Sequence, residues 1–171
     1  MRRALLHIAI LPALAALLAG CSLKQLAIRS TAAILDDSLA ALSAEPDPAQ
    51  AREAAASLLV MLEGLMRGDP ENAGLRRTAA QAYGSFAFGF LEAEEPDRAR
   101  RLYRRGRDHG LRALKTAPGF AAGGDLAAFK KAIAGLGRES LPLLFWTAYC
   151  WSGWINLSRS DPDAVADLAR V

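Results

Sequence analysis

The sequence has little of what a chemically reactive protein needs. Only two cysteines and two histidines occur in 171 residues, and aromatic residues make up 7%. No stretch shows the ligand spacing of a metal site, and none matches a known glycine-rich phosphate loop. Catalysis by a nucleophile usually requires a base and an orienting group within reach. The sequence therefore predicts a protein that is not an enzyme, with no metal and no cofactor.

Strand patterns are also missing. β-Branched residues are scarce, no two-residue alternation of apolar and polar side chains persists, and alanine and leucine are abundant. Such a composition favours helix. The 151 residues that follow the first 20 suit one domain. The expected fold class is all-α, in a single domain over residues 21–171.

The chain begins with an apolar run that is short for a membrane span. It extends from Ala4 to Leu18 and contains Pro12, whereas a membrane-spanning helix needs about 20 continuous apolar residues. Arg2 and Arg3 precede the run, and the small-residue string 18–21 follows it. A positive start, a short apolar core and a small-residue cleavage site predict a secretory signal peptide over residues 1–20.

The string Leu18-Ala19-Gly20-Cys21 resembles a bacterial lipobox, whose cysteine is acylated and becomes the first mature residue. The resemblance implies that Cys21 carries acyl chains such as palmitate and holds the protein to a membrane. Ser22, and not aspartate, comes next, which by similarity to sorted lipoproteins implies the periplasmic face of the outer membrane. An ordinary secreted protein with a free cysteine at this position is the alternative.

Neither charge nor cysteine pairing points to a special partner. The signal peptide holds two of the 21 basic residues, which leaves 19 basic against 18 acidic residues. Export across a membrane argues against nucleic acid as the partner. Once Cys21 is lipidated, Cys150 has no cysteine to pair with, and it stands among large apolar side chains. Cys150 is therefore expected to pack as a small hydrophobic residue.

Proline and aspartate divide the rest of the chain into helices. Turns are predicted at 45–48, 69–72, 95–97 and 160–163, with Asp47 as the cap of the helix that follows the first of them. Short turns join antiparallel helices into hairpins, which here suggest a degenerate tetratricopeptide-like solenoid. The 139–158 segment is apolar on every face and is expected to be central. The predicted helices are Leu23–Leu42, Pro48–Arg67, Ala73–Ala93, Pro96–Lys115, Leu126–Leu136 and Glu139–Ser158, before a last segment that reaches Val171.

Four stretches of the chain carry a resemblance to a known family. They are the lipobox followed by a helix that ends in Asp36-Asp37, residues 62–65 with 69–72, residues 82–92 with 99–106, and residues 144–157. In their order and spacing they resemble the T component associated with tripartite ATP-independent periplasmic (TRAP) transporters, a lipoprotein family with tetratricopeptide-like helices. Family members continue with further helix pairs after a segment like 163–171. The resemblance therefore implies a chain that is incomplete at its C-terminus.

The resemblance also implies a function. It predicts a non-catalytic accessory lipoprotein that docks a periplasmic substrate-binding protein of a TRAP system and offers a passage for its solute. It further implies association into a homo-oligomer. Two other functions stay open on the residues alone. One is a scaffold lipoprotein that assembles envelope complexes, and the other is an unrecognised hydrolase whose best residues are Glu63 and His109.

Three sets of residues are candidates for a site. Tyr83, Phe86 and Phe90 fall on one helical stripe, where they line a ligand channel or belong to the core. A basic patch on one helix face would bind an acidic protein surface or anionic lipid headgroups, or be a solvated face paired with nearby acids. Glu63 interrupts an apolar helix, as an acid/base residue or as an exposed glutamate. The residues of the basic patch that share a face are Arg100, Arg104 and Arg107.

Overall fold

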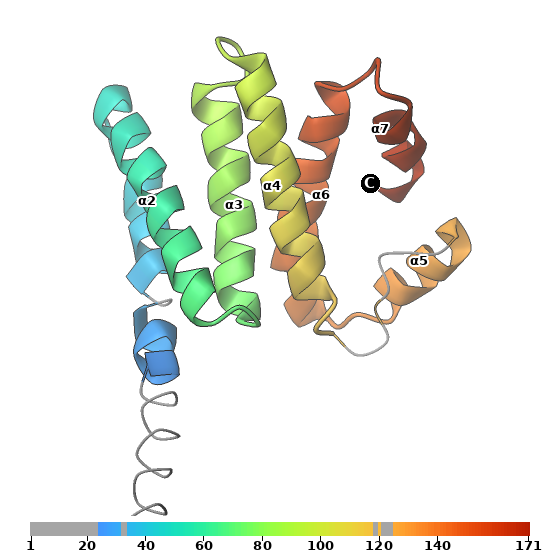
Figure 1. The fold of residues 1–171 in the computed structure, drawn as a ribbon, viewed down its shortest axis with the longest axis horizontal. Helices are drawn as coiled ribbons and strands as arrows, with labels where there is room; N and C mark the ends of the chain where they lie inside the picture. The colour runs from blue at the N-terminus through green and yellow to red at the C-terminus, as the bar shows by residue number, and fades with distance from the viewer. Residues whose placement is uncertain (1–23, 32–33, 118–119, 121–124) are drawn as a thin grey trace, which may run out of the picture.

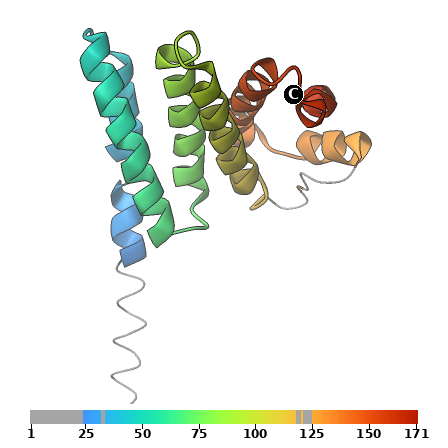
Figure 2. The ribbon, with the colours of Figure 1, turned by 45° about the horizontal axis from the view of Figure 1, so that its top comes forward.

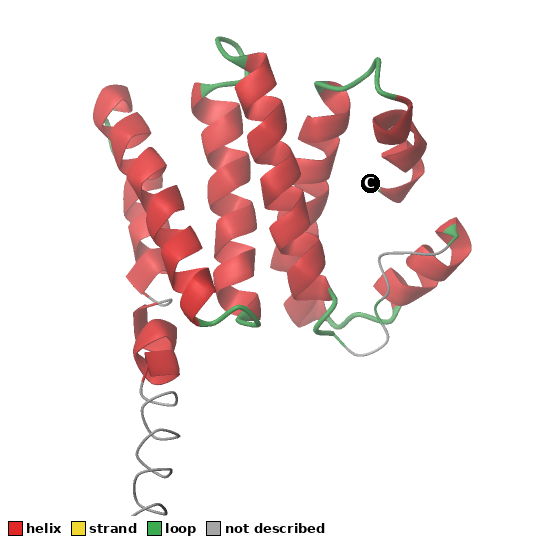
Figure 3. Cartoon of the chain, viewed as in Figure 1, coloured by secondary structure: helices red, strands yellow, loops and turns green. Residues whose placement is uncertain are grey.

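The computed structural model describes residues 24–31, 34–117, 120 and 125–171. Over these residues the chain forms helices joined by loops, and none of them belongs to a strand (Figure 3). The all-α prediction is therefore confirmed. The predicted signal peptide and Cys21 lie outside the described residues.

The main helices stand side by side in chain order. Figure 1 shows α2, α3, α4 and α6 as a row, with α5 and α7 beyond α6, and the row persists in the turned view of Figure 2. This arrangement is consistent with tetratricopeptide-like stacking of hairpins. Helical residues 24–31 and 34–43 come first, followed by α2 (Pro48–Gly68), α3 (Ala73–Phe90), α4 (Pro96–Leu114), α5 (Leu126–Ala134), the 3₁₀ turn η1 (Arg138–Ser140), α6 (Leu141–Asn156), α7 (Pro162–Ala166) and the 3₁₀ turn η2 (Asp167–Arg170).

Local capping chemistry explains why α2 and α3 begin where the sequence predicts. The Asp47 carboxylate accepts a hydrogen bond from the Ala49 amide at 2.9 Å, and Pro48 occupies the first turn of α2. Asn72 caps α3 by accepting from the Leu75 amide at 3.0 Å. The prediction for α3 is too long at its end, since the helix stops at Phe90 and the chain turns over residues 91–94 before Pro96.

The centre of the fold is the contact of α3, α4 and α6. Cys150 of α6 is fully buried there, and its thiol donates a hydrogen bond to the Ala80 carbonyl oxygen at 3.2 Å. Gly84 of α3 and Gly106 of α4 face the same sulfur. Small residues on all three helices thus let the backbones approach closely, and the packing role predicted for Cys150 agrees with its place in the core.

This burial predicts an unreactive thiol. Loss of solvation raises the pKa of Cys150 to about 12, and the thiolate is the reactive form. In the native protein, Cys150 is expected to stay unmodified by iodoacetamide at mildly alkaline pH, as measured by peptide mass spectrometry. The denatured chain serves as the positive control. Complete modification of Cys150 in the native protein would show that the α3–α4–α6 contact opens.

Candidate functional site

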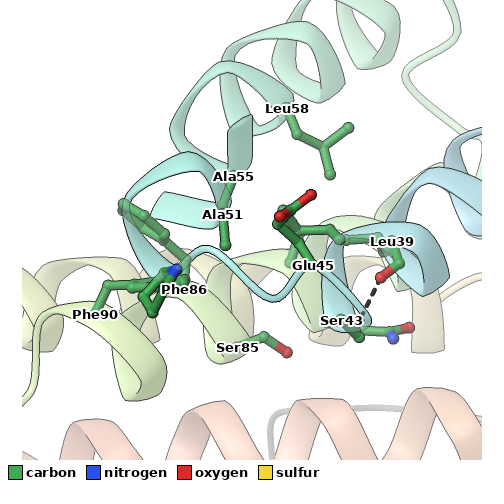
Figure 4. A pocket seen from close by; sticks show the side chains of 13 residues that line it. Leu39, Ser43, Glu45, Ala51, Ala55, Leu58, Ser85, Phe86 and Phe90 are labelled. Atoms are coloured by element: carbon green, nitrogen blue, oxygen red, sulfur yellow. Dashed lines mark hydrogen bonds between the residues drawn. The ribbon is translucent and has the colours of Figure 1, made fainter. Parts of the chain in front are cut away.

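A cavity of about 300 Å³ lies between the helical residues 39–43, α2 and α3. We refer to it as the α2–α3 cavity. Figure 4 shows Phe86 and Phe90 at one end of it in this view, and Leu39 and Ser43 at the other. Two of the three stripe aromatics therefore line a cavity, and their ring centroids are 5.6 Å apart. The full lining consists of Leu39, Leu42, Ser43, Glu45, Pro48, Ala51, Ala55, Leu58, Gln81, Ala82, Ser85, Phe86 and Phe90.

The cavity exists because small side chains occur where two helices meet. Ala51 and Ala55 are one turn apart on α2, and Ala82 lies on α3, and all three are buried in the lining. Residues four positions apart share a helix face. A larger side chain at any of these positions would fill part of the space between the helices.

Tyr83, the third aromatic residue of the α3 stripe, does not line the α2–α3 cavity and contacts Glu63 instead. The Glu63 Oε1 atom accepts three hydrogen bonds, from the Tyr83 hydroxyl at 2.8 Å, from an Arg105 nitrogen at 2.8 Å and from His109 Nε2 at 3.0 Å. The Arg105 guanidinium also stacks 4.7 Å from the centre of the Tyr83 ring. Together with Arg76, these residues form the Glu63 network, beside a second groove lined by Tyr83, Phe86 and Arg105.

The proton positions of the Glu63 network follow from Arg76. Its guanidinium has only donors, and one nitrogen lies 3.4 Å from His109 Nδ1 while Nε donates to the Pro70 carbonyl at 2.8 Å. His109 Nδ1 must then accept, so the neutral ring carries its proton on Nε2 and donates to Glu63. Both ring nitrogens are engaged, and no lone pair of His109 is left to act as a base. The structure thus brings the two hydrolase candidates together, but in an arrangement that ties α2, α3 and α4 to one another.

Burial and charge act in opposite directions on the pKa values of this network. Burial alone would raise the pKa of Glu63, but the hydrogen bond from Tyr83, the interaction with His109 and the charge of Arg105 bring it below its ordinary value. Burial lowers the pKa of His109, although the neighbouring Glu63 opposes this shift. Burial and the bond to Glu63 raise the pKa of Tyr83.

These shifts predict a stability that falls on acidification. Below pH 6.5, the ordinary pKa of histidine, His109 of the unfolded chain takes up a proton. Folded His109, which faces Glu63, Arg76 and Arg105, has a lowered pKa and takes up that proton only at lower pH, so acidification favours the unfolded state. Glu63 acts in the same direction at lower pH. We expect His109→Gln to reduce the fall in Tm between about pH 7 and about pH 5.5 by roughly 2 °C. Differential scanning calorimetry measures Tm at both pH values. A fall in Tm that is the same in His109→Gln and in the wild type would exclude His109 as the source of the pH dependence.

The three residues of the basic patch differ in how far packing leaves them exposed. Arg100 pairs with Asp97 at 3.3 Å, and Arg104 is exposed. The side chain of Arg107 is only 12% exposed, bonds to the carboxylate of Asp108, and stacks 4.4 Å from the centre of the Trp154 ring. Only Arg100 and Arg104 of the three predicted residues therefore offer an accessible basic surface.

The interpretation of α6 as a central helix is wrong on one side. Trp151 and Trp154 are buried as expected, whereas Leu141 and Phe145 are 55% and 58% exposed. Phe88 of α3 is 64% exposed and its ring contacts Tyr149 of α6. We call this surface the aromatic face. Its members are Phe88, Leu141, Phe145, Trp146 and Tyr149. The rings of the four aromatic members form a continuous set of contacts from α3 to α6.

Two further features are absent from the described residues. No group of three or more His, Cys, Asp or Glu side chains among them is placed to hold a metal ion. None of their helices is long and apolar enough to span a membrane.

Comparison with protein families decides which family the chain belongs to. The model of the family described as TRAP transporter T-component matches residues 44–171, which is most of the chain. The chain belongs to the TRAP transporter T-component family. Neither the curated proteins nor the solved structures gave a match. The T-component match confirms the resemblance found in the sequence and gives the chain a role with TRAP transport. It begins after Leu39, Leu42 and Ser43, which wall one end of the α2–α3 cavity.

Proposed function

We propose that this T-component is an accessory lipoprotein that docks a periplasmic substrate-binding protein of its TRAP system on the aromatic face. It acts as a binding scaffold and carries out no catalysis. The observation that carries this proposal is the exposure of Phe145 and Leu141 on a helix of a transport component. Large apolar side chains gathered on one surface mark interaction sites.

The composition of the aromatic face fits the centre of a protein interface. Helix α6 contains no charged residue in its 16 positions. Three exposed residues in the second half of α3, Ser85, Phe88 and Gly89, are also uncharged, and the Phe88 ring contacts Tyr149 of α6. Interface centres are depleted in charge and enriched in tryptophan, tyrosine and phenylalanine, and such residues supply most of the binding energy.

The basic patch is the weaker candidate for the docking surface. Arg107 is packed against Trp154, and Arg100 is paired with an acid, so these two of its three residues offer little free charge. Exposed ion pairs contribute little affinity, about 0–1 kcal/mol each. Arg104 and its neighbours would affect the rate of association more than its strength.

We further propose that lipid on Cys21 anchors the protein to the outer membrane, with the helices in the periplasm. The sequence supports this through the lipobox-like string 18–21 and through Ser22. A periplasmic substrate-binding protein would then meet the aromatic face without crossing a membrane.

Photo-crosslinking in living cells tests the docking surface. A photoreactive benzoylphenylalanine replaces Phe145 or Phe88 on the aromatic face, and Arg104 on the basic patch as the matched control. We expect both positions on the aromatic face to crosslink to a solute-binding protein, identified by mass spectrometry, and position 104 to crosslink far less.

The other outcomes would reject the proposal. Crosslinks from position 145 only to envelope-assembly proteins would favour the scaffold function. Crosslinks only to a second copy of the chain would assign the aromatic face to self-association. Efficient capture from position 104 alone would move docking to the basic patch.

A further inference from the structure

The α2–α3 cavity has the size and lining of a ligand site. Its volume of about 300 Å³ is at the lower end of the range for small-molecule sites, about 300–1,000 Å³, and far exceeds the roughly 30 Å³ that one water occupies in the liquid. Its walls are aliphatic along Leu39, Leu42 and Leu58, and aromatic at Phe86 and Phe90. An apolar body placed between these walls would leave water and gain dispersion contacts on both sides.

The polar groups of the cavity set the chemistry of the ligand's head. Neither Gln81 nor Ser85 has a side-chain hydrogen-bond partner among the described residues, so a carboxamide and a hydroxyl are available. The Ser43 hydroxyl already donates to the Leu39 carbonyl oxygen at 2.8 Å. Both Gln81 and Ser85 can donate and accept, which suits an alcohol or amide group.

Charge in the cavity excludes an acidic ligand. None of the 13 lining residues is a lysine, arginine or histidine, and the one charged residue is Glu45. The Glu45 carboxylate accepts hydrogen bonds from the Asp47 amide and from the Gln50 side chain, both at 3.0 Å. An anionic ligand would lose water without gaining a counter-ion, beside a fixed negative charge.

We infer that the α2–α3 cavity binds an uncharged small organic molecule with an apolar body and one hydrogen-bonding head. The ligand lies between the helical residues 39–43, α2 and α3, with its body against Phe86 and Phe90 and its head at Gln81 and Ser85. This site and the Glu63 network lie on opposite sides of the aromatic stripe of α3. The groove beside the Glu63 network is lined in part by arginines, whereas the α2–α3 cavity is not. The binding does not depend on docking to another protein.

Matched fluorinated probes test the inference on the full-length chain held in lipid nanodiscs. Fluorine NMR measures the affinities of para-fluorobenzyl alcohol, para-fluorobenzoate and para-fluorobenzylamine, with empty nanodiscs subtracted. We expect the alcohol to bind at least about tenfold more tightly than the benzoate, a difference of about 1.4 kcal/mol. Glu45 would attract an ammonium, but its carboxylate already accepts two hydrogen bonds, and an ammonium loses far more solvation than a hydroxyl in an apolar cavity. The amine is therefore expected to bind more weakly than the alcohol.

Two variants close the cavity from opposite walls. Ser85→Phe adds a ring at the open edge on α3, and Ala55→Leu fills the space from α2, so that one variant remains if the other fails to fold. Ser57→Phe is the matched control, because Ser57 is exposed on α2 and does not line the cavity. Both closing variants should abolish alcohol binding, and the control should retain it. Glu45→Gln should narrow the difference between alcohol and benzoate.

Three results would overturn the inference. One is alcohol binding that persists in the folded Ser85→Phe and Ala55→Leu proteins, since it would come from elsewhere. Another is benzoate or benzylamine binding as tight as that of the alcohol. The third is a wild-type chain that binds none of the three probes.

Discussion

Gly106→Ala is expected to lower the free energy of unfolding by about 1–2 kcal/mol. A Cβ atom at Gly106 would lie 2.6 Å from Cys150 Sγ and 3.3 Å from the Ala80 carbonyl oxygen. Overpacking of this kind costs about 1–3 kcal/mol. The gain in helix propensity from glycine to alanine, up to about 1 kcal/mol, offsets only part of that cost. Chemical denaturation followed by circular dichroism measures the change.

Gly64→Ala on α2 is the matched control for this prediction. The same substitution there meets nothing within 4 Å, so only the propensity gain remains. We expect Gly64→Ala to raise the free energy of unfolding by about 0.5–1 kcal/mol. If Gly106→Ala were equally stabilising, the close contact of α3, α4 and α6 would not exist in solution.

Cys21→Ser is expected to release the protein from the membrane almost completely. Several acyl chains on one cysteine make a stable anchor, because each buried methylene contributes about 0.8 kcal/mol. A serine hydroxyl at this position offers no thiol for acylation. In fractionated cells, the wild-type chain should be found with the outer membrane and should incorporate labelled palmitate. The variant should do neither.

Cys150→Ser supplies the control for lipidation. Serine keeps a donor for the Ala80 carbonyl that the Cys150 thiol contacts, and the lipobox-like string is unchanged. This variant should therefore remain in the membrane fraction and keep its label. Palmitate incorporation by Cys21→Ser equal to that of the wild type would rule out the lipid anchor on Cys21.

The helices were predictable because their signals are local. Asp47 and Pro48 fix the start of α2 by a cap and a set φ angle, and both are adjacent in the sequence. The family resemblance was also readable, since it depends on order and spacing along the chain. Cys150 was assigned to packing from its large apolar neighbours, and its full burial agrees.

The site could be predicted only in part, because it depends on which helix faces meet. Glu63 and His109 are 46 positions apart, and Arg76, which sets the proton position of His109, gave no signal in the sequence. The sequence of α6 shows that apolar residues occur on all of its faces. It does not show that one of these faces has no other helix packed on it among the described residues. The α2–α3 cavity arises from small residues on two helices, which the sequence alone does not bring together.

Capture from periplasmic extract is the most direct test of the docking proposal. The purified chain from Ser22 to Val171 serves as bait, circular dichroism verifies its helical fold, and mass spectrometry identifies the bound proteins. The proposal predicts enrichment of a periplasmic solute-binding protein, with loss of that enrichment when Phe145→Ser is introduced. A folded bait that enriches only envelope-assembly proteins, or that captures the solute-binding protein equally well with Phe145→Ser, would contradict docking on the aromatic face.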